Sequence, residues 1–308
     1  VPKGLVLVNT KGKLERANRE YKTTVEPIDT LIPIVVLVND ETASASEITS
    51  GSLQDLDRAV ILGTRTYGKG LVQAPMELPY NGNLKLTTSK YYIPSGRCIQ
   101  AINYKHSRGG YLEHVPDSLT KVFHTANGRI VRDGGGINPD VKVLPDSLPN
   151  IAFYLANSGM DSTEVMTNWV LNYIKQHPTI GDPKSFIISD ADYENFKSAV
   201  IKSGFKYDRQ SEKVIKNLID IAKFEGYYDD AKSEFAALEK KLQHNLAKEL
   251  DHHKQTIKQV LTADLVAAYY YQRGAIANSL QFAKQWKEAV KLLENPQEYK
   301  KILMPKQH

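Results

Sequence analysis

Two short segments of this 308-residue chain carry residue types that could cleave or transfer an acyl group. The first is Asn39–Ile48, which reads NDETASASEI and follows the continuous apolar run 32–38. This order predicts a buried strand, a short loop and a helix that begins at or just after Ser44. The first amides of a helix have no acceptor within it and carry the positive end of its dipole. A serine at this turn is therefore a candidate nucleophile with an oxyanion site beside it.

The same residues also fit a purely structural role. Ser44 and Glu47 have the spacing of a capping box, in which the hydroxyl accepts a backbone N–H and the carboxylate reaches back to the cap. Such boxes are routine helix starts, so this segment alone favours the capping role over the nucleophile.

The second segment is Thr66–Gln73, TYGKGLVQ, which follows a strand-like run and places Lys69 between two glycines. Glycines allow another part of the backbone to approach closely. A desolvated lysine loses its charge more readily, by up to about 3–5 pKa units when fully buried. A neutral amine near Ser44 could take the hydroxyl proton, which is the Ser-Lys variant of the catalytic triad. An isolated lysine is more often a solvated loop residue.

The elements that would position these segments form a predicted α/β core over residues 1–146. Strands are predicted at 5–8, 32–38, 59–62 and 83–93, with a turn at 80–83 and a helix over 44–56. From 147 to 308, apolar residues recur at helical spacing, which predicts an all-helical domain of roughly six helices. Helix stops are expected at Gly204, Gly226 and Gly274.

Composition excludes little. Hydrophobic residues make up 41% and charged residues 24%, which is ordinary for a globular protein. The net charge of +5 is small and dispersed, so nucleic acid is not indicated as a partner. Cys98 is the only cysteine, and no run approaches the length of a membrane span. No metal or organic cofactor is implied.

Four segments in order resemble the carboxyl-terminal processing peptidases, also called tail-specific proteases. They are TASASEI at 42–48 with Gln54-Asp55, YGKGLVQ at 67–73, YIPSGRCIQ at 92–100 and GGINPD at 135–140. The last two lie about thirty residues apart, which is similar to the long Bacteroidetes-type form of the family. The resemblance implies a serine endopeptidase with a mixed-sheet, ClpP/crotonase-like α/β core. It also implies that the helical half is the C-terminal extension of this long form.

The resemblance assigns roles to individual residues. Ser44 matches the nucleophile, Lys69 the general base and Gln73 a residue that orients the lysine. The Ala45 N–H is the expected first oxyanion donor. Asp55 matches an acid implicated in some relatives, and a structural ion pair is at least as common a role for it.

The resemblance also implies features upstream of Val1. A second oxyanion donor belongs to a motif of the type Asp-Leu-Arg-x-Asn-x-Gly-Gly, and a PDZ module grips the substrate's C-terminal residues. Since one missing donor can cost about 10²–10³ in rate, we expect residues 1–308 alone to be inactive or weak. Substrates are expected to be proteins cut at or near their C-terminal tails, in the periplasm or cell envelope.

Other interpretations stay open at this point. Gly63-x-x-x-x-Gly68-Lys69 nearly matches a phosphate-binding loop, but Gly70 replaces the magnesium-binding Ser or Thr and a strand-like run follows. His106 or His124 could replace Lys69 as base, although nothing in their setting supports it. The helical half could instead be an oligomerisation or adaptor-binding module attached to a degenerate peptidase core.

Overall fold

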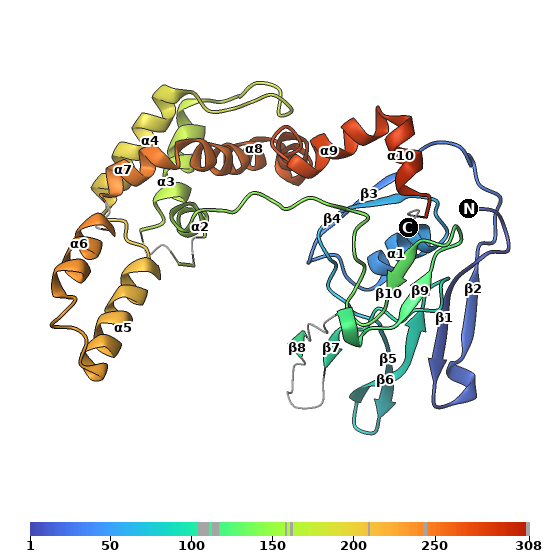
Figure 1. The fold of residues 1–308 in the computed structure, drawn as a ribbon. Helices are drawn as coiled ribbons and strands as arrows, with labels where there is room; N and C mark the ends of the chain where they lie inside the picture. Colours follow the sequence, from blue (N-terminus) through green and yellow to red (C-terminus); the bar gives the residue numbers. More distant parts are fainter. Residues whose placement is uncertain are drawn as a thin grey trace. The chain divides into compact units, whose positions relative to one another are not determined.

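In the computed structural model, a three-stranded parallel sheet carries the serine segment (Figure 1). The strand order is β11 (Val141–Lys142), β4 (Val60–Gly63) and β3 (Val35–Val38). Helix α1 (Ala45–Asp55) joins β3 to β4, as parallel neighbours require a crossover. All four residues of β4 are buried, as expected of a central strand covered on both faces. The predicted strand and helix are thus confirmed, and Ser44 lies between them.

The structure describes residues 1–103, 111–112, 117–157, 159–160, 163–208, 210–242 and 245–305. These residues form two units, one of residues 1–145 with 284–308 and the other of residues 146–283. The first unit is the expected α/β core and the second is helical.

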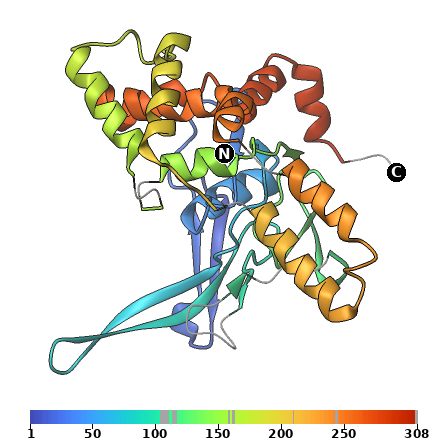
Figure 2. The same cartoon turned by 90° about the vertical axis from the view of Figure 1, so that its left-hand side faces the viewer.

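A four-stranded antiparallel sheet completes most of the first unit. Its order is β2 (Arg19–Lys22), β1 (Val6–Gly12), β6 (Gly82–Tyr92) and β5 (Leu71–Leu78). The predicted turn before β6 is present, because Tyr80 and Asn81 both have positive φ values, 63° and 58°, which a tight hairpin needs. Figure 2 shows β5 and β6 as a long hairpin, in cyan to teal, whose turn extends away from the other strands.

Short elements connect these sheets in the first unit. They are η1 (Glu15–Ala17), β7 (Ile102–Asn103), β8 (Tyr111–Leu112), η2 (Asp117–Leu119), β9 (Val122–His124) and β10 (Ile130–Arg132). Residues from both sheets and from the segments after β6 share one apolar core, which contains Val8, Val38, Ile61, Tyr91, Ile93, Ile99 and Ile137. The segment that carries the lysine and the segment that carries the serine are therefore packed on a common core.

The second unit contains seven helices within its described residues. They are α2 (Asn150–Ala156), α3 (Val165–Gln176), α4 (Asp190–Ser203), α5 (Gln210–Glu225), α6 (Lys232–Leu242), α7 (Leu246–His252) and α8 (Lys254–Ser279). Their core is built around Trp169, Tyr193, Phe196, Leu261 and Leu265. Among the described residues, no helix combines the length and apolar character that crossing a membrane requires.

Two of the three predicted helix stops are confirmed. Gly204 ends α4 and Gly226 follows α5, and both have the positive φ that favours glycine. Gly274 does not end a helix, because it lies inside α8. The backbone of α8 departs from helical geometry three residues earlier, at Tyr271, where φ is 55° and ψ is −166°.

The last two helices depart from the expected domain division at residue 147. Helices α9 (Lys284–Leu293) and α10 (Pro296–Ile302) belong to the first unit. Leu292 and Tyr299 pack against Val60 of the parallel sheet, and the Tyr299 hydroxyl bonds to both the N–H and the carbonyl oxygen of Ile34, each at 2.9 Å. Helical periodicity could not reveal this, because it does not indicate which surface a helix covers.

Candidate active site

Ser44 has a strained backbone at the turn between β3 and α1. Its φ is 58° and its ψ is −119°, a combination that costs non-glycine residues of order 1–3 kcal/mol. Such strain concentrates at functional sites, where the surrounding structure enforces it. The residue is half-buried, and its turn keeps the predicted capping box, in which the Glu47 carboxylate reaches back to the Ser44 amide.

The carboxylate of Glu47 joins this turn to the lysine segment. It is completely buried and accepts four hydrogen bonds. Oε2 accepts from the amides of Ser44 (2.9 Å) and Lys69 (2.8 Å). Oε1 accepts from the Gly68 amide (2.7 Å) and the Thr66 hydroxyl (2.5 Å). Because one oxygen atom bonds both amides, the Ser44 and Lys69 backbones are close together although 25 positions separate them in sequence.

The glycines beside Lys69 serve the close approach that was predicted. A Cβ on Gly68 would come within 2.4 Å of the Ala101 Cβ, and one on Gly70 within 2.8 Å of the Gln100 amide nitrogen. A desolvated amine beside Ser44 stays a prediction, because the lysine itself is exposed in this structure. The glycines allow the backbone, and not the lysine side chain, to pack against its neighbours.

Ala45 and Gln73 of the predicted site lie on the surface. Ala45 is the first residue of α1 and is exposed, so its amide belongs to the first turn, which lacks acceptors within the helix. Gln73 is exposed on β5 and pairs with Thr87 of β6. Within the described part of the chain, no hydrogen bond joins Gln73 to Lys69, so its orienting role stays a prediction.

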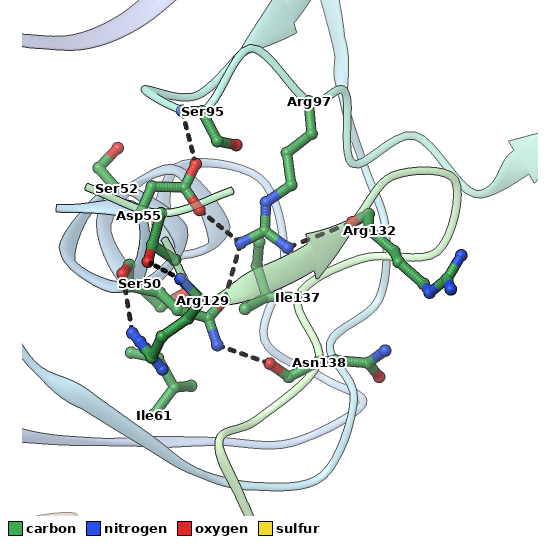
Figure 3. Close-up of polar contacts among 12 residues, drawn as sticks. Ser50, Ser52, Asp55, Ile61, Ser95, Arg97, Arg129, Arg132, Ile137 and Asn138 are labelled. Carbon is green, nitrogen blue, oxygen red and sulfur yellow. Dashed lines mark hydrogen bonds and ion pairs between the residues drawn. The ribbon is translucent and has the colours of Figure 1, made fainter. Parts of the chain in front are cut away.

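Asp55 lies at the other end of α1, in a buried ion pair. Its Oδ1 accepts from Arg97 Nη2 at 2.8 Å and its Oδ2 accepts from the Ser95 amide at 3.0 Å. Figure 3 shows the Arg97 guanidinium directed at this carboxylate. The same Nη2 also donates to Gln54 Oε1 at 2.7 Å. Burial lowers the pKa of Arg97, and the Asp55 carboxylate opposes that shift. The geometry therefore favours the structural role for Asp55.

A second buried arginine extends this network to the parallel sheet. Arg129 forms ion pairs with Asp57 (2.6 Å) and Asp140 (2.5 Å). The other oxygen of Asp140 accepts from the Ile61 amide of β4 at 2.8 Å, and Gln54 Nε2 donates to Asp140 Oδ1 at 2.9 Å. The C-terminal end of α1 is thus anchored by charged side chains to β4 and to the segment before β11.

The competing interpretations find little support. Leu71 begins a β-strand, which contradicts the helix that a phosphate-binding loop requires after its lysine. His124 is exposed on β9, and His106 lies outside the described residues. Within the described ranges, no group of three or more His, Cys, Asp or Glu residues could hold a metal ion.

Family models match both units. Residues 1–106 match the model described as "Peptidase family S41". Residues 156–293 match the model described as "Probable PDZ-protease, C-terminal helical domain". The family resemblance inferred from the sequence, with its α/β core and helical extension, is thereby confirmed.

Relatives of the S41 segment carry the name of processing proteases. A carboxy-terminal-processing protease of Bartonella bacilliformis is 45% identical over 96 residues, which cover 31% of this chain and 22% of that protein. The chloroplastic carboxyl-terminal-processing peptidase 1 of Arabidopsis thaliana is 39% identical over 142 residues, or 46% and 22% of the two chains. A solved photosystem II D1 C-terminal processing protease is 31% identical, with a TM-score of 0.34, and the match covers 48% and 30%. The chain spans about a fifth of the length of these curated relatives.

The sequence did not reveal which side chains hold the Ser44 turn in place. Its pattern indicated a local helix cap for Glu47 and did not assign a role to Thr66 or Tyr91. A fully buried glutamate needs several hydrogen-bond donors. The sequence did not show that Glu47 is buried, so it did not indicate that Thr66 and the lysine segment supply those donors.

We expect Glu47→Gln to destabilise the first unit. A glutamine has one acceptor oxygen, and its NH₂ group would face N–H donors, so at least two hydrogen bonds to a charged acceptor are lost. At about 1.5–3 kcal/mol each, the free energy of unfolding should fall by roughly 3 kcal/mol or more. Urea unfolding measures this, with exposed Glu41→Gln of the same loop as control. Equal unfolding curves for the two variants would contradict the assignment of Glu47.

We expect Asp55→Asn to lower stability without disabling the serine. Removing one partner of a buried ion pair costs about 3–5 kcal/mol, whereas the exposed Asp40→Asn should stay within about 0.5 kcal/mol. In the full-length protein, labelling of Ser44 by a fluorophosphonate, normalised to the folded fraction, should match the parent. A large loss of labelling in fully folded Asp55→Asn protein would show that the carboxylate takes part in the chemistry.

Proposed function

We propose that the protein containing this chain is a serine endopeptidase with Ser44 as nucleophile and Lys69 as general base. The observation that carries the proposal is the strained Ser44 turn tied to the lysine segment through Glu47 Oε2. Two residue types that can form a Ser-Lys dyad are thus held close together at a helix N-terminus. The names of the S41 relatives support the same reaction class.

The proposed reaction is peptide-bond hydrolysis through an acyl-enzyme. Ser44 Oγ attacks the scissile carbonyl carbon while the Lys69 amine takes its proton. Lys69 then gives the proton to the leaving amine of the substrate. Water next attacks the ester while Lys69 takes one of its protons, and Lys69 returns that proton to Ser44 Oγ as the acid product leaves. The Ala45 N–H supports the oxyanion at the start of α1. Since Lys69 is exposed, the mechanism requires that bound substrate covers the amine and excludes water from it.

The substrate class and location follow from the resemblance and are part of the proposal. Substrates are proteins cleaved at or near their C-terminal tails, and the enzyme works in the periplasm or cell envelope. The names of the processing proteases among the relatives support the substrate class. No step requires a metal or an organic cofactor.

The decisive experiment uses full-length protein and an unstructured polypeptide substrate. Ser44→Ala and Lys69→Ala should each lower kcat/KM by at least about 10³-fold, because the nucleophile and its base act as one unit. The controls Ser46→Ala, on the exposed start of α1, and Lys85→Ala, on the exposed part of β6, should stay within about twofold. Cleavage by both dyad variants at the parental rate would exclude the dyad.

A second candidate role concerns the helical unit. Val214, Leu218, Ile221 and Phe224 form an apolar stripe on α5, with exposed fractions of 64%, 46%, 44% and 90%. The adjoining side of α5 is buried through Ile215 and Ile219, so the apolar surface of this helix extends beyond the part that is packed against its own unit. We propose that the α5 stripe mediates self-association, and an adaptor protein is the alternative occupant.

Size-exclusion chromatography with light scattering tests this role in the full-length protein. Leu218→Glu combined with Phe224→Glu should reduce the number of subunits, whereas Lys216→Glu changes an exposed charge on the polar side of α5 and should not. An unchanged assembly, or a parent that is already monomeric, would remove the self-association role.

A further inference from the structure

Tyr91 contacts the backbones of both proposed catalytic residues, Ser44 and Lys69. It lies on β6 opposite Thr10 of β1, is only 3% exposed, and belongs to the apolar core of the first unit. Its hydroxyl donates to the Ser44 carbonyl oxygen at 3.3 Å and forms a second, shorter contact with the Lys69 carbonyl oxygen. The ring is thus fixed in the core while the hydroxyl reaches the serine and lysine backbones.

These contacts complement those of Glu47. Glu47 Oε2 accepts from the amides of Ser44 and Lys69, and the Tyr91 hydroxyl lies at the carbonyl oxygens of the same two residues. Ser44 and Lys69 are therefore each held at both the N–H and the C=O group. The atom that holds each group of Ser44 also holds the same group of Lys69. An atom that bonds two groups restricts the distance between them, and a buried aromatic ring has few alternative positions.

We infer that Tyr91 is a positioning residue, which holds Ser44 and Lys69 at the separation that proton transfer between them requires. The inference rests on the proposed Ser-Lys dyad. It adds a residue that touches neither the substrate nor the transferred proton and acts only through the backbones of the two residues that do. Reaction rates are sensitive to such placement, since a misplacement of 1 Å can cost about 10²-fold.

The electrostatic surroundings suit this role. The hydroxyl can donate to a carbonyl oxygen only while it is protonated. Burial, followed by the negative charge of Glu47, raises the pKa of Tyr91. The phenol therefore keeps its proton at all pH values at which the enzyme would work, and shares it between the two carbonyl acceptors.

The neighbouring Tyr92 offers a matched control. It belongs to the same strand, but adjacent strand residues point to opposite faces, and Tyr92 is only half-buried. Lys11 Nζ lies 5.0 Å from the centre of its ring. Tyr91→Phe and Tyr92→Phe remove the same atom from consecutive residues of one strand, and only the first removal affects the serine and lysine backbones.

The test compares parent, Ser44→Ala, Tyr91→Phe and Tyr92→Phe in the full-length protein on one unstructured polypeptide. Rates are taken at a temperature at which circular dichroism shows every variant folded, so that reduced stability alone does not lower kcat. Tyr91→Phe should lower kcat by about 10- to 100-fold with KM within about twofold. The rate of Ser44 labelling by a fluorophosphonate should fall by a similar factor. Tyr92→Phe should leave both rates within about twofold.

The outcomes separate the two proposals. An inactive parent, or an active Ser44→Ala variant, would refute the proposed function. If those two behave as expected and Tyr91→Phe keeps the parental kcat and labelling rate, the dyad stands and the positioning role is wrong. A Tyr91→Phe protein that folds at no temperature would also refute the inference, because the hydroxyl would then support the fold and not the site.

Discussion

The buried carboxylate of Glu47 is the interaction on which the site depends. A fully buried negative charge is tolerated only when hydrogen bonds compensate its lost hydration. Here four donors do so, and they come from both the β3–α1 turn and the lysine segment. The need to satisfy one side chain therefore brings together two segments that local sequence cannot join. It also stabilises the unfavourable φ of Ser44, since the Ser44 amide is one of the four donors.

Helix α1 is held by charge at both ends. Glu47 acts at its first turn, and Asp55 with Arg97 acts at its last, backed by Arg129 and Asp140. Of the residues proposed to do chemistry, Ser44 is half-buried, and Ala45 and Lys69 are exposed. The supporting groups are almost entirely buried. The first unit thus combines a rigid, charge-compensated frame with accessible reactive atoms, which is the arrangement that a preorganised site needs.

Local patterns predicted the parts of the fold that local physics determines. The apolar run before Ser44 became β3, the S-x-x-E start became α1, and the turn at Tyr80 became a hairpin. Contacts between distant segments were not predictable in this way. The glycines beside Lys69 predicted a close backbone approach, but not that Ala101 and Gln100 are the residues they approach. The role of Tyr91 was missed for the same reason, since no spacing rule links a strand tyrosine to carbonyl groups 22 and 47 positions away.

The return of α9 and α10 to the first unit has a consequence for how the chain folds during synthesis. The helical unit is an insertion, because the chain enters it near residue 146 and leaves it near residue 283. A ribosome therefore releases the whole helical unit before the residues that cover Val60 and bond to Ile34 exist. Domains usually fold in the order in which they emerge. Of these two units, the one that starts earlier in the chain is therefore finished last, and its parallel sheet keeps an uncovered apolar surface until residues 284–302 have been made.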